Sequence, residues 1–428
     1  MNNQSNGSLI KNIFSCTEEG GKMINRFELS NGVRIVEEAL PALRSVSIGV
    51  WVLSGSRNET DSNNGISHLI EHMLFKGTPT KTARDIAEAF DSIGGHANAF
   101  TSKEYTCLYA KVMDLHADYA LDLMFDMLFN SKIDEEELER EKNVIYEEIA
   151  MTEDTPDDII HDYLHDISFK DHPLSKPILG DHSSLDSITR DDILKYKENF
   201  YAADRIVISL AGNITDEISQ KVKTLFEQIP RKKTPDDLLT DCYSSQTLEK
   251  RKDTNQAHIC LGYKGIPIGN KSIYDISILN NVLGGSMSSR LFQKIREDLG
   301  LTYTIFSYHN AFRDNGLLTI YGATTVEQLE QLEYEVYKTI DELQKQGITQ
   351  REFENTKQQL KGQLVLGLEN PNSRMHRNGQ NELLYQPHLT LDELIEQIEK
   401  VTRDEIMKIA SEIFNNSPSK ACILPMDV

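Results

Sequence analysis

Tyr105-Thr-Cys-Leu-Tyr-Ala110 and Gly316-Leu-Leu-Thr-Ile-Tyr321 are two apolar, strand-like segments that begin 211 residues apart in a chain of 428 residues. Intervals of 211, 215 and 215 residues separate three further pairs of segments: Val46-Ser-Ile-Gly-Val50 and Ala257-His-Ile-Cys-Leu261, Lys132 to Leu138 and Gly347 to Phe353, and Arg205-Ile-Val-Ile-Ser209 and Lys420-Ala-Cys-Ile-Leu424. The alternative is that α/β patterns repeat by accident, but here the order of the four elements matches as well as their spacing. The sequence therefore predicts a duplicated domain.

The first copy alternates strands with helices. Phe27 to Val36 reads as a hairpin, because Asn31-Gly32 supplies the turn that two-residue hairpin loops prefer. The other expected elements are strands at 46–52, 105–112 and 205–211 and helices near 66–75, 116–129 and 134–152. This mixture predicts an α+β fold with two homologous domains, each a mixed or antiparallel sheet packed with helices.

The expected domain boundaries follow from composition. The polar segment 1–22 lacks the apolar core of a signal peptide, so we expect a disordered leader, with Met23 as an alternative start. The first domain would span 23–232 and the second 256–428. The polar stretch 233–255 would be the linker between them.

The overall composition restricts the classes of partner. The formal net charge of −22 repels nucleic acid and anionic lipid and attracts cationic partners, although acidity also serves solubility alone. No run approaches the roughly 18 apolar residues that are needed to cross a membrane. The five cysteines are scattered and contain no Cys-x-x-Cys pair, so neither a disulfide framework nor a cysteine metal site is expected. We expect a cytoplasmic protein that binds neither nucleic acid nor membranes.

The helix expected at 66–75 carries His68-Leu-Ile-Glu71-His72. At about 100° per residue, the three ionisable side chains share one face, and apolar side chains cover the others. A helix that is apolar nearly all round is buried, and burying three ionisable groups without a partner is costly. Two imidazoles one turn apart can bind one cation, and zinc suits them. The alternative is a chance match in a buried helix.

The helix expected at 134–152 supplies two inward carboxylates. Glu141 and Glu148 fall within its apolar stripe, whereas the neighbouring Glu147 points away from it. Two like charges on a buried stripe raise each other's pKa unless a cation lies near them. That cation is either a zinc ion or an unseen lysine or arginine.

These residues together match the requirements of a catalytic zinc site, which has three protein ligands and one open position. His68, His72 and Glu148 would bind one zinc ion per chain. Glu71 would be the general base that takes a proton from the attacking water. Glu141 would orient a ligand or share protons.

The second copy provides an internal comparison. The repeat intervals align the five ionisable residues of the first copy with neutral ones: Leu279, Val282, Leu283, Thr356 and Gln363. Neighbouring apolar positions of the same helices keep their character. Joint loss of all five is expected if they serve one metal site that the second copy lacks.

From about Met23 to its C-terminus, the sequence resembles the pitrilysin, or inverzincin, peptidases, and most closely their half-size, processing-peptidase-like members. The family signature is His-x-x-Glu-His with a glutamate ligand at a fixed interval beyond it. Glu148 keeps that interval, 76 positions after His72. The resemblance implies a zinc-dependent endopeptidase.

The resemblance also implies where a peptide binds. The segment 95–101 is similar to the edge strand on which these enzymes dock an extended peptide, which would place Asn98, Ala99 and Phe100 beside the scissile region. The alternative is an ordinary strand that follows the Gly94-Gly95 turn.

A second substrate element is implied in the other copy. The segment 285–303 resembles a family element in which Arg296 and Tyr303 would contact the substrate backbone and help stabilise the tetrahedral intermediate. The alternative for Arg296 is a solvated helix end. Family members enclose the site in a chamber built from two such two-domain halves, so the resemblance implies a homodimer in which Arg296 and Tyr303 reach the partner chain's zinc.

The sequence thus predicts an endopeptidase that binds an extended, mainly basic peptide as an added strand and hydrolyses it with zinc-activated water. One alternative is a catalytically silent scaffold or peptide-binding partner of the same fold. Another is a metal-free peptide-binding chaperone. The sequence does not separate precursor processing from peptide clearance.

Overall fold

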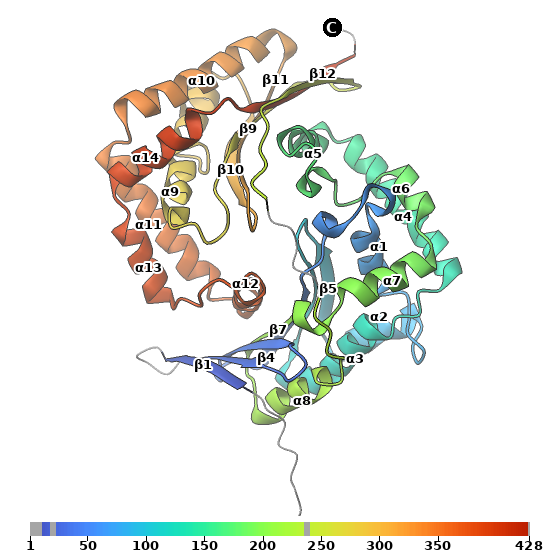
Figure 1. Cartoon of the computed structure of the whole chain (residues 1–428). Helices are drawn as coiled ribbons and strands as arrows, with labels where there is room; N and C mark the ends of the chain where they lie inside the picture. The colour runs from blue at the N-terminus through green and yellow to red at the C-terminus, as the bar shows by residue number, and fades with distance from the viewer. Residues whose placement is uncertain (1–10, 18–22, 235–239, 427–428) are drawn as a thin grey trace, which may run out of the picture. The chain divides into compact units, whose positions relative to one another are not determined.

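A computed structural model describes residues 11–17, 23–234 and 240–426 and divides the chain into two compact units. Unit 1 comprises Met1–Glu147, Pro177–Asp237 and Leu366–Thr390, and unit 2 comprises Glu148–Lys176, Leu238–Val365 and Leu391–Val428. Each unit contains one sheet with its own helices (Figure 1).

The sheet of unit 1 has seven strands in the order β1-β2-β3-β7-β4-β6-β5. They are β1 (Lys11–Thr17), β2 (Met23–Glu28), β3 (Arg34–Ala39), β4 (Ser45–Val52), β5 (His96–Thr101), β6 (Thr106–Met113) and β7 (Ile206–Gly212). The expected hairpin is confirmed: β2 and β3 pair antiparallel, and Gly32 in the turn has a φ of 104°, which glycine adopts without strain. β3 and β7 are parallel and the other neighbours antiparallel, so the sheet is mixed.

The sheet of unit 2 has five strands in the order β10-β11-β9-β12-β8. They are β8 (Thr247–Lys252), β9 (Ala257–Lys264), β10 (Thr304–Ala311), β11 (Gly316–Thr324) and β12 (Ser419–Pro425). Only β12 and β8 are parallel among its neighbours. The order β8-β12-β9-β11-β10 therefore repeats β3-β7-β4-β6-β5 of unit 1, strand for strand and direction for direction. The expected α+β fold with two homologous domains is confirmed.

The helices of the chain divide between the two units. The helices counted with unit 1 are α1 (Ile66–Met73), α2 (Ala83–Ser92), α3 (Ala117–Phe129), α4 (Glu135–Glu153), α6 (His182–Ser187), α7 (Arg190–Phe200), α8 (Asp216–Phe226) and α12 (Pro371–Leu383). Those counted with unit 2 are α5 (Pro156–Ser168), α9 (Ile273–Leu283), α10 (Leu329–Gln346), α11 (Gln350–Gly367), α13 (Leu391–Lys400) and α14 (Arg403–Phe414). Two of these helices pack on the sheet of the other sequence repeat. α5 follows α4 in the first repeat but packs on β9 and β12. α12 belongs to the second repeat but packs on β3, β4 and β7.

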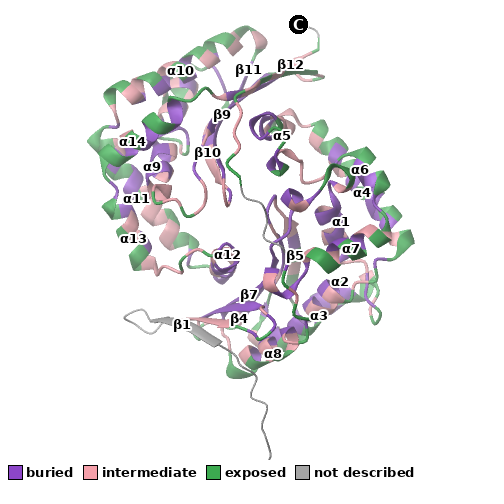
Figure 2. Ribbon diagram, viewed as in Figure 1, coloured by how far each residue is buried: buried purple, intermediate pink, exposed green. Residues whose placement is uncertain are grey.

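α12 lies close against the sheet of unit 1 because glycines remove side chains from the contact. A Cβ atom at Gly49 on β4 would collide with the sulfur of Met375 on α12, and one at Gly379 on α12 would collide with the indole of Trp51. Figure 2 shows β4 and β7 mostly buried under this cover. This close contact fixes the position of α12 on β4 and β7.

A buried ionic cluster anchors the end of α12 to unit 1. Arg26 Nε donates to Glu382 at 2.6 Å, His388 Nε2 lies 2.9 Å from the same carboxylate, and Arg34 donates to the Glu382 main-chain carbonyl. Burial raises the pKa of Glu382, but the hydrogen bonds of His388 and Arg26 outweigh it and lower that pKa to about 2. The carboxylate is therefore ionised and paired at neutral pH.

The expected boundaries differ from the observed ones in three respects. Within the expected leader 1–22, Lys11–Thr17 forms β1 and pairs with β2; residues 1–10 and 18–22 lie outside the described part. Within the expected linker 233–255, β8 joins the sheet of unit 2. The units are also discontinuous in sequence, because α5 and α12 are exchanged between the repeats.

Candidate metal centre

α1 carries the His-x-x-Glu-His motif on a short, mostly buried helix. Ile66, Leu69, Ile70 and Met73 are buried, as the apolar pattern predicts. His68, Glu71 and His72 are half-buried on the remaining face. The helix ends before Gly77, whose φ of 116° stops helical continuation.

α4 presents the carboxylates that the helical pattern selects. Asp134 Oδ1 accepts hydrogen bonds from the main-chain N–H groups of Glu136 and Glu137, and these fix the start of the helix. Glu141 is buried and Glu148 is half-buried, whereas Glu147 is exposed. α4 is unbroken from Glu135 to Glu153, so the division between the units, which falls within it, does not interrupt the helix.

The structure brings His68, His72 and Glu148 together. One ligand atom from each lies within 4.8 Å of the other two, an arrangement that could hold a metal ion. Two imidazoles and one carboxylate form the donor set of many catalytic zinc sites. Burial, and then the neighbouring His72, lower the pKa of His68 to about 4, so its imidazole is neutral and able to coordinate at neutral pH. These residues fit zinc.

Glu141 lies behind His72, where it was expected to orient a ligand. Its Oε2 is 3.0 Å from His72 Nδ1, and its Oε1 is 2.5 Å from the ammonium of Lys76. Such a carboxylate fixes the ring orientation and leaves Nε2 of His72 as the nitrogen that would face a metal. The sequence left open whether the inward glutamates meet a metal or a basic side chain. Glu141 meets a basic side chain, that of Lys76, whereas Glu148 lies with the two histidines. Lys76 was missed in the sequence, although it follows His72 by one helical turn.

Thr101 at the end of β5 is a second contact that the sequence did not reveal. Its hydroxyl donates to Glu71 Oε2 at 2.5 Å. This bond orients the carboxylate expected to act as the base and connects it to the strand expected to hold the peptide. Only the direction of a threonine side chain at a strand end could have indicated it, and that depends on the register of β5.

Replacing Thr101 with valine is expected to reduce kcat for peptide cleavage by roughly 10- to 100-fold with little change in zinc affinity. Valine keeps the shape of threonine but removes the donor, so Glu71 loses one charge-assisted hydrogen bond worth roughly 1.5–3 kcal/mol. Steady-state kinetics with zinc-loaded protein measure the effect, and Thr101→Ser, which keeps the hydroxyl, is the control. Equal kcat values for the valine variant and the parent would show that this contact does not prepare the base.

β5 is an edge strand, as expected for a strand that could dock a peptide: among the strands that the structure describes, it pairs with β6 alone. The Asn98 side chain is exposed and Ala99 is buried, and the Ala99 main-chain N–H donates to Asn98 Oδ1 at 2.8 Å. Phe100 is half-buried, with its ring 5.8 Å from that of Trp51 and 5.7 Å from that of His376. An incoming strand would therefore meet the Asn98 side chain and a firmly packed Phe100.

Arg296 and Tyr303 lie in unit 2: Arg296 is within the helical segment Phe292–Asp298, and Tyr303 follows that segment. The Arg296 guanidinium stacks 4.6 Å from the ring centre of Phe292, and its Nε is 3.6 Å from Glu297. Tyr303 is 84% exposed. Their expected contact with substrate at a partner chain's site stays a prediction.

The second repeat lacks the chemistry and buries apolar residues in its place. Leu279, Val282 and Leu283 on α9 are buried in the core of unit 2. Thr356 and Gln363 lie on α11, the counterpart of α4. The His-His-Glu cluster is the one group of this kind among residues 11–17, 23–234 and 240–426.

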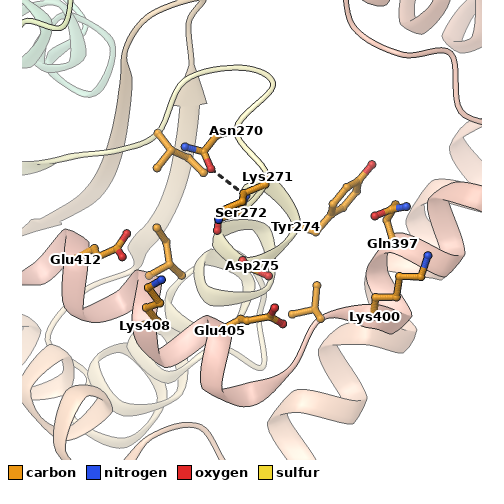
Figure 3. A pocket seen from close by; sticks show the side chains of 13 residues that line it. Asn270, Lys271, Ser272, Tyr274, Asp275, Gln397, Lys400, Glu405, Lys408 and Glu412 are labelled. Carbon is orange, nitrogen blue, oxygen red and sulfur yellow. Dashed lines mark hydrogen bonds between the residues drawn. The ribbon is translucent and has the colours of Figure 1, made fainter.

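A surface cavity of about 380 Å³ in unit 2 is separate from this chemistry (Figure 3). Its lining mixes polar and apolar residues and includes the exposed charged side chains of Lys271, Lys400, Glu405 and Lys408 and the buried Asp275. None of its lining residues belongs to the His-His-Glu cluster, so the candidate active site lies elsewhere. In the described part of the chain, no helix combines the length and apolarity that crossing a bilayer requires.

Comparison with family models gives two consecutive matches. Residues 34–182 match the model described as insulinase (peptidase family M16), and residues 187–360 match the model described as the peptidase M16 inactive domain. The first match contains both histidines and both inward glutamates, and the second covers most of the repeat that lacks them.

Related proteins extend the match over nearly the whole chain. An uncharacterized zinc protease of Bacillus subtilis is 52% identical, with 94% of this chain and 98% of the relative aligned. An uncharacterized zinc protease of Streptomyces coelicolor is 37% identical, with 96% and 91% aligned. A crystal structure of a protease from Helicobacter pylori superimposes with a TM-score of 0.89 at 22% identity, covering 94% of this chain and 99% of that one. This last likeness supports the fold alone.

Proposed function

Because the chain belongs to the M16 peptidase family, we propose that it is a zinc-dependent endopeptidase that cleaves extended peptides or precursor segments. One observation carries the proposal: ligand atoms of His68, His72 and Glu148 lie within 4.8 Å of one another. Glu71 lies on α1, the helix that carries both histidines. The neutral residues at the aligned positions of the second repeat would hold no metal.

The residues divide the work of hydrolysis between them. His68, His72 and Glu148 would hold the zinc, which when bound supplies Lewis acidity to activate a water and polarise the scissile carbonyl. Glu71 takes the proton of the attacking water and passes it to the leaving amine, because it lies on the ligand-bearing face of α1. Thr101 holds one oxygen of Glu71, and Glu141 holds the ring of His72 in its binding orientation.

The peptide would bind as an additional strand on β5. An edge strand offers unpaired main-chain groups that accept many sequences, while alternate side chains give modest selectivity. Asn98, Ala99 and Phe100 would lie beside the scissile bond. The net charge of −22 favours basic peptides.

We further propose a homodimer of processing-peptidase-like arrangement acting in the cytoplasm. In it, Arg296 and Tyr303 of each chain would contact the substrate at the partner chain's zinc and stabilise the oxyanion as it forms. The exposure of Tyr303 is consistent with a side chain that becomes covered on assembly. A catalytically silent scaffold of the same fold is the alternative, since one of the two matched family models is described as inactive.

Terminally blocked, quenched peptides test this proposal. Zinc-loaded protein is expected to cleave them at internal bonds, identified by mass spectrometry, and to cleave lysine- and arginine-rich members faster than glutamate-rich ones of equal length. Blocked termini exclude cleavage by a contaminating exopeptidase. Zinc binding without cleavage of any member would favour the silent scaffold, and peptide binding that survives chelation would favour a metal-free binding protein.

A further inference from the structure

The zinc-binding helix has no capping side chain of its own. α1 is eight residues long, and its N-cap position is Gly65, with a φ of 94° and no side-chain hydrogen bond. A Cβ atom at Gly65 would lie 2.7 Å from the main-chain oxygen of Leu179, so a larger capping residue does not fit. The first N–H groups of a helix need acceptors, and a helix this short is marginal without them.

Glu59, six residues before the N-cap, supplies those acceptors. Its Oε2 accepts from the main-chain N–H of Gly65 and from Asn64 Nδ2, both at 2.8 Å, and its Oε1 accepts from the N–H of Ser67 at 2.8 Å. The residue is only 5% exposed. Burial raises the pKa of Glu59, while the hydrogen bonds that its oxygens accept from Ser67, Gly65 and Asn64 lower it. The positive end of the helix dipole likewise favours the ionised carboxylate.

The same end of α1 is held from the opposite side. The hydroxyl of Ser67 lies 3.0 Å from Tyr196 on α7, and Ser54 donates to the same tyrosine hydroxyl at 3.0 Å. Ser54, Ser67 and Tyr196 are all buried. Glu59 and Tyr196 thus fix the backbone and side chain of Ser67, the residue directly before His68.

We propose that Glu59 is a positioning residue for zinc: by fixing the start of α1, it sets where the rings of His68 and His72 lie before the metal arrives. This inference rests on the proposed function. Glu59 does not coordinate the metal, and its effect passes through the main chain of Gly65 and Ser67. Two ligands on one pre-set helix lose less conformational freedom on binding than two on a frayed one.

Glu59→Gln tests the proposal, because an amide keeps the size of the side chain but supplies one acceptor oxygen in place of two. Competition against a chromogenic chelator is expected to show about tenfold weaker zinc binding, in the range typical for residues that support metal ligands. The matched control is Thr402→Ala, which removes the N-cap of α14 in unit 2, where the Thr402 side chain accepts from the Glu405 N–H. Its metal-free protein is expected to unfold at a lower temperature with unchanged zinc affinity.

The outcomes separate this inference from the proposed function. If the parent binds zinc and Glu59→Gln binds it equally well, Glu59 only stabilises the fold and the inference is overturned. If the parent itself binds no zinc, the proposed function fails instead. Should Glu59→Gln not fold, Glu59→Asp keeps the carboxyl group but its shorter side chain cannot reach both N–H groups, and the same loss of zinc affinity is expected of it.

Discussion

Replacing Glu71 with glutamine is expected to reduce kcat for peptide cleavage by about 10³-fold while zinc stays bound, since general-base catalysis contributes roughly 10²–10⁴-fold. The amide has nearly the same shape and can still accept the hydrogen bond from Thr101. It cannot take a proton from water at neutral pH. The loss should therefore appear in kcat rather than in KM or zinc content.

Steady-state kinetics with matched zinc content measure kcat and KM for both proteins. Glu88→Gln, an exposed exchange of the same chemistry on α2, is expected to match the parent. Equal activity of Glu71→Gln and the parent would point to another base or to a contaminating peptidase. A variant that loses its zinc would instead show that Glu71 supports the metal.

Replacing Glu148 with glutamine is expected to weaken zinc binding by more than about 100-fold, above the 10–100-fold typical for residues that only support a ligand. A neutral amide is a poorer ligand than a carboxylate, and it leaves the two histidines without a compensating negative charge. Cleavage at limiting zinc should fall in parallel and recover in part when zinc is added in excess.

The neighbouring glutamate provides the control for this prediction. Glu147 lies one residue earlier on α4 but is exposed, so Glu147→Gln is expected to keep the zinc affinity of the parent. Equal effects of the two exchanges would mean that general charge, rather than coordination, holds the metal. An effect of Glu147→Gln alone would mean that the assigned face of α4 is wrong.

Much of the fold could be predicted because the repeat supplies long-range information that local patterns lack. The interval of about 211 residues paired β4 with β9 and β6 with β11, and the structure confirms the shared strand order. Helical periodicity alone placed Glu141 and Glu148 inward and Glu147 outward, as observed.

The exchanged helices could not be predicted in the same way. The apolar faces of α5 and α12 show that each helix packs on something, but not on which sheet. That choice depends on close contacts such as those of Gly49 with Met375 and Gly379 with Trp51, which join residues far apart in sequence. The contacts of Lys76, Thr101 and Glu59 could not be predicted for a similar reason, since each depends on the direction of a side chain within the folded site.

The most direct test of the central claim is to titrate metal-free protein with zinc while the cleavage of a blocked basic peptide is followed. We predict no cleavage without zinc, a linear rise in rate, and a break at one equivalent per chain. A full rate of cleavage in the metal-free protein would contradict the assignment of a zinc endopeptidase. So would zinc that binds at one equivalent per chain without any cleavage.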